Sequence, residues 1–338
     1  MDPSRARGPA GTRGSRHDRS GSIRSHVGGD VRPWPRAGPA RTLGPGRRGD
    51  HRMERIIVGV DGSECSADAL RWAHREARIR DATVTALLAW NFLDQHHVDD
   101  ETTFDPHYGE AEAQQALDVL VQRALGDDAD DVHREVVCDL PATALLGASK
   151  DADLLVVGAR GLGSFRGLVL GSVSQRCLEH AACPVMVVHG TPSDGDQGRV
   201  VVGVDGSEPS ALALEWALEE ARLRGATLEV VHSWDVPYAA EFTFVGDAYD
   251  AAQGSATDLV DRMLVAAGLA PADVIRTVVQ GSPVVVLTDA AAGADLVVVG
   301  SRGRGGFAGL LLGSVSHQVS RHAERPVVVV PDPSRAAG

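Results

Sequence analysis

Two glycine patterns of the same spacing are the residues of this chain best suited to binding a phosphate group. The first is Gly158, Gly161 and Gly171-Ser172, and it recurs 142 residues later as Gly300, Gly303, Gly313 and Ser314. Glycine lets the backbone approach a ligand closely. Gly171-Ser172 opens a predicted helix, and the free N–H groups and positive dipole end of a helix attract anions. Because the pattern occurs twice, the sequence predicts two phosphate sites.

Charged residues accompany both patterns. Arg160 and Arg302 precede the second glycine of each copy, where a guanidinium could pair with phosphate oxygens; a solvated surface arginine is the alternative. Asp61 and Asp205 follow the first predicted strand of each copy. A carboxylate there could accept a hydrogen bond from a ribose hydroxyl or an adenine amino group. An aspartate before Gly-Ser also suits a turn or a helix cap, and the two roles are compatible.

The familiar motifs of nucleotide enzymes are absent from the sequence. A P-loop needs GxxxxGK[ST], whereas Lys150 is the only lysine of the chain and lies outside the glycine patterns. The first strand is followed by "GVDGS" rather than by GxGxxG. Neither a GxSxG elbow nor a kinase catalytic loop occurs. The sequence therefore indicates nucleotide binding without an evident catalytic nucleophile.

An internal repeat defines the domain organisation. Residues 56–90 recur at 200–234, and residues 151–188 recur at 293–330, a period far longer than that of a solenoid. We predict two domains, at 53–190 and 199–331, with a linker at 191–198 and a tail at 332–338. Residues 1–52 are rich in Arg, Gly, Pro and Ser and lack apolar periodicity. They are predicted to be a disordered arm, with Met53 as the expected true start.

Each copy alternates β-branched runs with amphipathic stretches, which predicts a doubly wound, Rossmann-like α/β domain with a parallel sheet. In the first copy the expected strands are 55–60, 83–89, 133–138, 154–158 and 185–189, and the expected helices are near 64–80, 109–125, 142–150 and 172–182. Ser63 and Ser207 are candidate helix caps. With strand order 3-2-1-4-5, strands one and four flank the point where the order reverses, so the aspartate and the glycine loop would line one crevice.

Composition and charge exclude several classes of partner. Residues 1–52 have a net charge of +8 and the remainder −21, and so acidic a folded part repels nucleic acid and anionic membranes. No apolar run is long enough to span a bilayer. The four cysteines form no CxxC pair, which favours reduced thiols in the cytoplasm.

One loop combines possible metal ligands, but no tetrahedral ligand spacing is evident, and the second copy has no histidine there. We predict a solvated loop and no metal site; the residues are Asp94, His96, His97, Asp99, Asp100, Glu101 and His107.

On these motifs the chain resembles the universal stress protein family in its tandem form, over residues 54–331. The matched signature is G-x2-G-x9-G-[ST], which marks the ATP-binding branch of that family, and both copies satisfy it. The resemblance implies two tandem domains of the adenine nucleotide alpha hydrolase-like type, each with a five-stranded parallel sheet in 3-2-1-4-5 order. It also implies ATP with Mg²⁺ in each domain, and pairing of the domains through their C-terminal strands.

The same resemblance assigns residues to the nucleotide. Asp61 and Asp205 would contact adenosine, and Ala89 and Ser233 would offer backbone atoms to adenine. The predicted binding set is Gly59, Asp61, Ala89, Gly158, Arg160, Gly161, Gly171, Ser172 and Val173 in the first copy, with Gly203, Asp205, Ser233, Gly300, Arg302, Gly303, Gly313, Ser314 and Val315 in the second. The first copy has Asp139-Leu140-Pro141 where the second has Gly281-Ser282-Pro283, so we expect a side chain to crowd the first site.

The function expected from the sequence is an ATP-binding regulator or sensor of the stress response. Nucleotide occupancy would modulate contacts with an unknown protein partner. The alternatives are a slow ATPase or phosphotransferase, for which Asp61 and Asp205 are the only acid–base candidates, and a scaffold with empty sites. An Arg-arm nucleic-acid binder is a weaker alternative. The tandem repeat suggests an internal pseudo-dimer, and a further homodimer is compatible with it.

Overall fold

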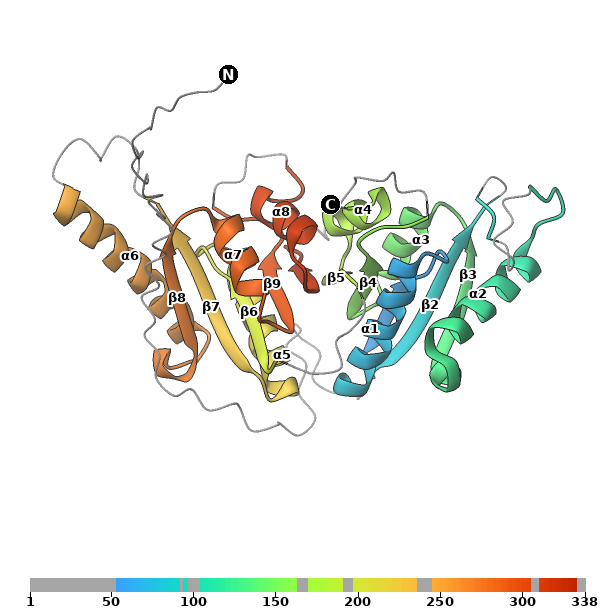
Figure 1. The fold of residues 1–338 in the computed structure, drawn as a ribbon, viewed down its shortest axis with the longest axis horizontal. Coiled ribbons are helices and arrows are strands. Elements are labelled where there is room, and N and C mark those ends of the chain that lie inside the picture. Colours follow the sequence, from blue (N-terminus) through green and yellow to red (C-terminus); the bar gives the residue numbers. More distant parts are fainter. Residues whose placement is uncertain are drawn as a thin grey trace, which may run out of the picture.

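Each half of the chain alternates strands and helices in the predicted order (Figure 1). The computed structural model describes residues 53–91, 94–96, 104–162, 170–190, 197–235, 245–304 and 310–332. The predicted arm at 1–52, most of the predicted linker (191–196) and all but the first residue of the predicted tail (333–338) lie outside these ranges.

The first half contains β1 (Arg55–Gly59), α1 (Glu64–Arg80), β2 (Thr83–Trp90), α2 (Glu110–Leu125), η1 (Gly126–Asp131), β3 (Val132–Cys138), α3 (Pro141–Ala148), β4 (Leu154–Gly158), α4 (Ser172–His180) and β5 (Val185–Val188). The second half contains β6 (Arg199–Gly203), α5 (Glu208–Arg224), β7 (Thr227–Trp234), α6 (Val245–Ala266), η3 (Pro271–Asp273), β8 (Ile275–Gln280), α7 (Pro283–Ala291), β9 (Leu296–Gly300), α8 (Ser314–His322) and β10 (Val327–Val330).

Within each half the strands follow the predicted 3-2-1-4-5 order, as β3-β2-β1-β4-β5 and β8-β7-β6-β9-β10. The two halves nevertheless share one sheet of ten strands, where the sequence predicted two five-stranded sheets. They join because β5 and β10 pair antiparallel, with Val187 opposite Val327, which confirms the expected pairing of the domains through their C-terminal strands. The combined sheet is therefore mixed, although every other strand pair in it is parallel.

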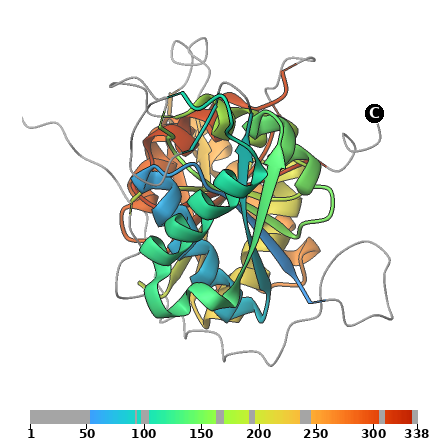
Figure 2. The same ribbon diagram turned by 90° about the vertical axis from the view of Figure 1, so that its right-hand side faces the viewer.

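Helices cover both faces of the sheet and enclose two apolar cores (Figure 2). One core packs α1, α2, α5 and α6 against one face, and the other packs α3, α4, α7 and α8 against the opposite face. Strands β4 and β9 are buried along their whole length, which explains why their sequences are apolar at every position.

Local sequence sets the ends of the helices that follow β1 and β6. The hydroxyl of Ser63 accepts a hydrogen bond from the amide of Ser66 and caps α1, and Ser207 caps α5 in the same way. Both helices end in a left-handed residue, Gly225 in the second half and Asp81 in the first. The predicted caps are confirmed, and they fix where the chain leaves β1 and β6.

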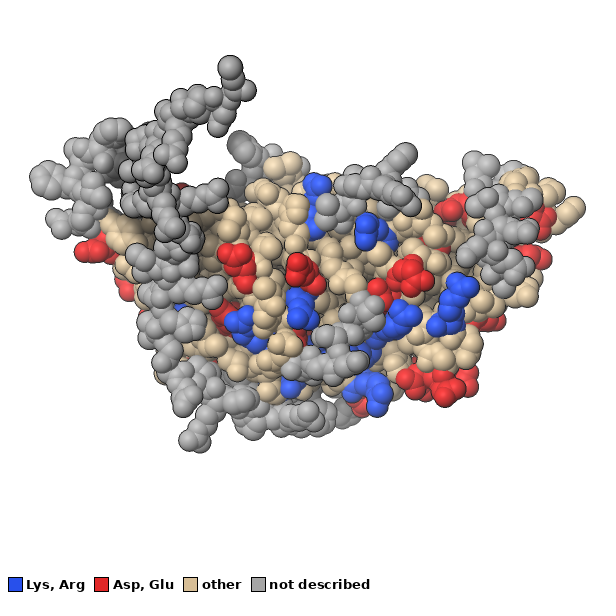
Figure 3. All heavy atoms as spheres, viewed as in Figure 1, with Lys and Arg blue, Asp and Glu red and all other residues tan. Residues whose placement is uncertain are grey.

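No helix in the described part of the chain is long and apolar enough to cross a bilayer. Among the described residues, acidic and basic side chains are interspersed over the face drawn in Figure 3.

Candidate functional site

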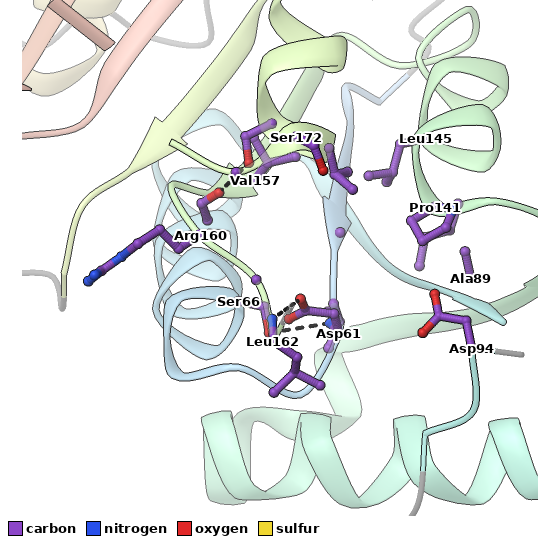
Figure 4. Close-up of a pocket in the computed structure, with 18 of the residues that line it drawn as sticks. Asp61, Ser66, Ala89, Asp94, Pro141, Leu145, Val157, Arg160, Leu162 and Ser172 are labelled. Atoms are coloured by element: carbon purple, nitrogen blue, oxygen red, sulfur yellow. Dashed lines mark hydrogen bonds between the residues drawn. The ribbon is translucent and has the colours of Figure 1, made fainter. Parts of the chain in front are cut away.

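A cavity of about 470 Å³ opens where β1 and β4 end and α4 begins. Figure 4 shows residues that surround it, among them Asp61 after β1, Ala89 in β2, Pro141 and Leu145 in α3, and Ser172 at the start of α4. All nine residues predicted for this copy line the cavity: Gly59, Asp61, Ala89, Gly158, Arg160, Gly161, Gly171, Ser172 and Val173.

The second half has a matching cavity of about 450 Å³ at the ends of β6 and β9. It is again lined by all nine predicted residues: Gly203, Asp205, Ser233, Gly300, Arg302, Gly303, Gly313, Ser314 and Val315. The structure therefore gathers both predicted sets, and each lies where a doubly wound sheet binds its ligands.

The start of α4 is the part of the first cavity that suits an anion. Gly171 occupies the N-cap position with an extended backbone, and it has no side chain to satisfy the amides of the first turn. Its own amide bonds the carbonyl oxygen of Ala159 at 2.7 Å, which fixes the turn into the helix. Gly313 repeats this arrangement before α8. Open amides at a positive dipole end form a phosphate cradle.

Two glycines of each pattern are required by packing inside the protein. A Cβ atom at Gly158 would lie 2.6 Å from the carbonyl oxygen of Cys65 in α1, and one at Gly161 would lie 2.3 Å from Oδ2 of Asp61. The second half shows the same close approaches at Gly300 and Gly303. At Gly171, by contrast, the nearest atom to an added Cβ is 3.5 Å away. Only at the last glycine of the signature would an added Cβ make ordinary contacts without a clash.

Asp61 joins the β1–α1 turn to the glycine loop. Its Oδ1 accepts hydrogen bonds from the amide and hydroxyl of Ser63, and its Oδ2 accepts one from the amide of Leu162 at 3.0 Å (Figure 4). Asp205 makes the equivalent bonds to Ser207 and Arg304. The predicted turn role is therefore present in both halves, and each aspartate also borders its cavity.

Hydrogen bonds stabilise the ionised form of Asp205. Burial acts to raise the pKa of this carboxyl, but the hydroxyl and amide of Ser207 and the amide of Arg304 outweigh burial and hold the pKa below its ordinary value. A carboxylate that is already ionised and hydrogen-bonded is a weak proton acceptor. This geometry favours a positioning role over general base catalysis.

Comparison with known proteins decides the family. The profile of the universal stress protein family matches residues 53–189 and again 198–331. The chain belongs to the universal stress protein family. It is 36% identical over 284 residues to the universal stress protein Rv2623 of Mycobacterium tuberculosis, covering 81% of this chain and 95% of that protein. A Mycolicibacterium smegmatis universal stress protein is 35% identical over 298 residues, covering 81% and 96%.

Solved structures agree in fold. A universal stress protein structure from Archaeoglobus fulgidus superimposes with a TM-score of 0.58 at 23% identity, covering 82% of this chain and 96% of that one. A Pseudomonas aeruginosa structure gives a TM-score of 0.59 at 16% identity, covering 84% and 95%. At these identities the structures support the shared architecture alone.

Arg160 and Arg302, the arginines predicted to contact phosphate in this universal stress protein, do not point at a phosphate site in the described conformation. Arg302 pairs through Nη2 with Oδ2 of Asp332 at 2.6 Å. The side chain of Arg160 points away from the cavity in Figure 4, and the residue equivalent to Asp332 in the first half is Gly190. Phosphate contact by either guanidinium therefore stays a prediction that requires a change of rotamer.

The expected crowding of the first site does not occur. Leu140, at the predicted obstruction, is 60% exposed, and Asp139 bonds the adjacent Leu140 amide through its own carboxylate. The first cavity is no smaller than the second.

Sequence reasoning missed the apolar walls of both cavities. In the first half Leu87, Pro141, Leu145 and Val157 line the space, and Val231, Pro283, Leu287 and Val299 do so in the second. Their matched positions in the two copies were a usable signal. Trp90 and Trp234, by contrast, are not among the described lining residues, and each makes an edge contact with a tyrosine.

The predicted solvated loop is described only in part. Asp94, His96 and His107 lie within the described ranges, and His97, Asp99, Asp100 and Glu101 lie outside them. Over the described residues, no group of three His, Cys, Asp or Glu side chains is placed to hold a metal ion.

Proposed function

We propose that each half of this universal stress protein binds ATP reversibly, and that occupancy changes the contacts of the protein with a partner. The observation that carries this proposal is the pair of matched cavities. Each has an open helix start at one end and an apolar wall at the other. A volume near 450–470 Å³ lies within the range of small-molecule sites.

The chemistry of the walls matches the parts of a nucleotide. The amides at the start of α4 would hold the phosphates, and the slot formed by Leu87, Leu145 and Val157 would take a flat base. The residues present also fit Mg²⁺ as a partner of ATP. Because both carboxylate oxygens of Asp61 are already hydrogen-bonded, the ion would be held mainly by phosphate oxygens and water. It would offset the triphosphate charge in an acidic protein.

The lining favours binding over turnover. Among the described lining residues, the ionisable groups are Asp61, Asp94, His96 and Arg160 in the first cavity, and Asp205 and Arg302 in the second. Asp61 and Asp205 are engaged by backbone amides, and Arg302 by a carboxylate. We therefore propose a nucleotide-dependent regulator. The free state of all four cysteines supports a reducing compartment, and we propose the cytoplasm.

Substitution of the helix-opening glycines tests the proposal directly. An aspartate at position 171 or 313 suits the extended N-cap backbone and would cap the helix, but its charge would repel a phosphate. We expect calorimetry with Mg-ATP to give two sites per chain for the wild type. Either Gly171→Asp or Gly313→Asp should leave one site, and the double variant none.

Alanine at the same positions is the matched control. Its Cβ makes only ordinary contacts there, so Gly171→Ala should still bind ATP. Thermal melts of all variants check that the fold is kept. Absence of ATP binding in the wild type, or wild-type affinity in the double aspartate variant, would refute the proposal.

A further inference from the structure

Among the described lining residues, the two cavities differ at the end remote from the helix start. In the first, the carboxylate of Asp94 faces the space beside Ala89 and Pro141, across from Ser172 at the start of α4 (Figure 4). In the second, the only carboxylate among the described lining residues is that of Asp205, the counterpart of Asp61. Asp94 therefore gives the first cavity an additional hydrogen-bond acceptor.

Backbone contacts hold Asp94 in place. The amide of Asp94 donates to the carbonyl oxygen of Asn91 at 3.1 Å, and the amide of Asn91 donates to the carbonyl oxygen of Asp94 at 3.0 Å. Two residues on, the hydroxyl of Tyr108 accepts from the amide of His96 and donates to its carbonyl oxygen. These bonds anchor the segment to the end of β2 and to Tyr108, two residues before α2. The carboxylate is thus presented by a fixed backbone.

Two acceptor groups lie at this end of the first cavity, the carbonyl oxygen of Ala89 and the carboxylate of Asp94, and they are not equally available to a ligand. Nε2 of His96 lies 3.2 Å from the carbonyl oxygen of Ala89 and can donate to it, so the carbonyl that the family resemblance assigned to adenine already has a partner. Among the described residues, no group hydrogen-bonds or ion-pairs with the carboxylate of Asp94. An ionised carboxylate only accepts hydrogen bonds, so it favours a ligand group that donates.

We propose that Asp94 accepts a hydrogen bond from the exocyclic amino group of a purine base in the first cavity. This half would then select aminopurine nucleotides. The inference rests on the proposed function, because the phosphates at the start of α4 direct the base toward the apolar wall. Leu87, Leu145 and Val157 would bury the ring faces, and Asp94, beside Ala89 and Pro141, would accept a hydrogen bond from the edge of the base.

Purine riboside 5′-triphosphate is the discriminating probe, since it lacks only the amino group of ATP. Binding is measured in the full-length Gly313→Asp protein, which leaves the first cavity open. We expect ATP to bind about tenfold more tightly than the analogue, the size of a partly solvated hydrogen bond to a charged group. In Asp94→Ala on this background, the ratio of the two affinities should fall to about one.

A matched variant controls for charge. Asp128→Ala removes the same charge from the exposed turn η1, outside the cavity, and should keep the tenfold ratio. Asp94→Asn, which keeps an acceptor oxygen, should restore part of it. An unchanged ratio in Asp94→Ala, or an equal loss of both ligands, would overturn the role of Asp94 while leaving ATP binding intact. Failure of the wild type to bind ATP at all would instead overturn the proposed function.

Discussion

Four charged side chains lie buried where the two halves meet, and their removal gives the sharpest stability prediction. Glu76 and Arg80 come from α1, and Glu220 and Arg224 from the matched positions of α5. Both glutamate side chains are 0% exposed, and those of Arg80 and Arg224 are 8% and 2% exposed. Glu220 bonds Arg80 and, at 2.5 Å, Nε of Arg224. Glu76 bonds Arg224 and lies 3.6 Å from Nε of Arg80.

The cluster is incompletely satisfied. Oε2 of Glu76, Nε of Arg80 and Nη1 of Arg224 have no hydrogen-bond partner among the described residues. Burial raises the pKa of Glu76, against the attraction of Arg224. For Glu220 burial acts in the same direction, but Arg80 and Arg224 outweigh it and lower the pKa. Glu76 is therefore the less well compensated of the two carboxylates.

The perturbation is Arg224→Met. It fills a similar volume but leaves two buried carboxylates facing the single guanidinium of Arg80. Breaking a buried ion pair by removing one partner costs about 3–5 kcal/mol. That is a large fraction of a typical stability of about 5–15 kcal/mol. Replacing all four residues with apolar ones should instead be neutral or stabilising by about 1–4 kcal/mol, because the buried charges are removed together. Only the partly exposed Glu54, which pairs with Nη1 of Arg80 at 3.3 Å, loses a partner.

Urea unfolding followed by circular dichroism measures both variants against the wild type. Arg123→Met on the exposed side of α2 is the control, and it should change the free energy of unfolding by less than about 0.5 kcal/mol. If Arg224→Met costs no more than this control, or if the fully apolar cluster costs as much as Arg224→Met, the reasoning about uncompensated charge is wrong.

Three smaller predictions concern the second site and the thiols. Gly303→Ala places a Cβ 2.3 Å from Oδ2 of Asp205 and should cost about 1–3 kcal/mol in thermal melts, since a hydrogen-bonded loop contact breaks. Asp205→Asn should lower the free energy of unfolding by about 1 kcal/mol at pH 7, discounted for partial exposure. Because the pKa of Asp205 in the folded protein lies below the ordinary 3.8, the difference in stability between wild type and variant should disappear as the pH falls through that lower pKa. A difference that grows in acid would contradict this. Burial raises the pKa of Cys177 and Cys183 to about 12, so a thiol reagent at pH 7.5 should modify exposed Cys138 and reach those two only after unfolding.

Much of the fold was predictable because the repeat supplied every pattern twice. The strand after Met53 and the serine caps followed from local sequence, and the order of the strands within each half followed from the resemblance to the universal stress protein family. The site residues were predictable for a related reason. The carboxyl ends of β1 and β4 are neighbours once the strand order is known, so Asp61 and Gly161 had to meet.

The sequence did not predict why glycine is needed at each position of the pattern. Gly158 and Gly161 fit a ligand-binding pattern, yet their Cβ positions are closed by Cys65 and Asp61. Such close approaches depend on how α1 and the glycine loop pack, which no local pattern encodes. The ion pair of Arg302 with Asp332 was missed for the same reason, since the two residues are distant in sequence.

The buried charges were also hidden from sequence reasoning. Glu76 and Arg80 are four residues apart, a spacing typical of exposed helix pairs, and Glu220 and Arg224 repeat it. Only the meeting of α1 and α5 across the junction removes all four from water. This arrangement is specific to paired halves, because each glutamate bonds an arginine of the other helix.

The junction and the two cavities lie at opposite ends of the same helices. α1 begins beside Asp61 and ends at Arg80, and α5 begins beside Asp205 and ends at Arg224. Separating the halves would expose unpaired charges and break the β5–β10 ladder at once. It follows that the halves should unfold as one cooperative unit. A ligand in either cavity then stabilises both halves by mass action, so occupancy of one site is transmitted as stability of the whole without any conformational change.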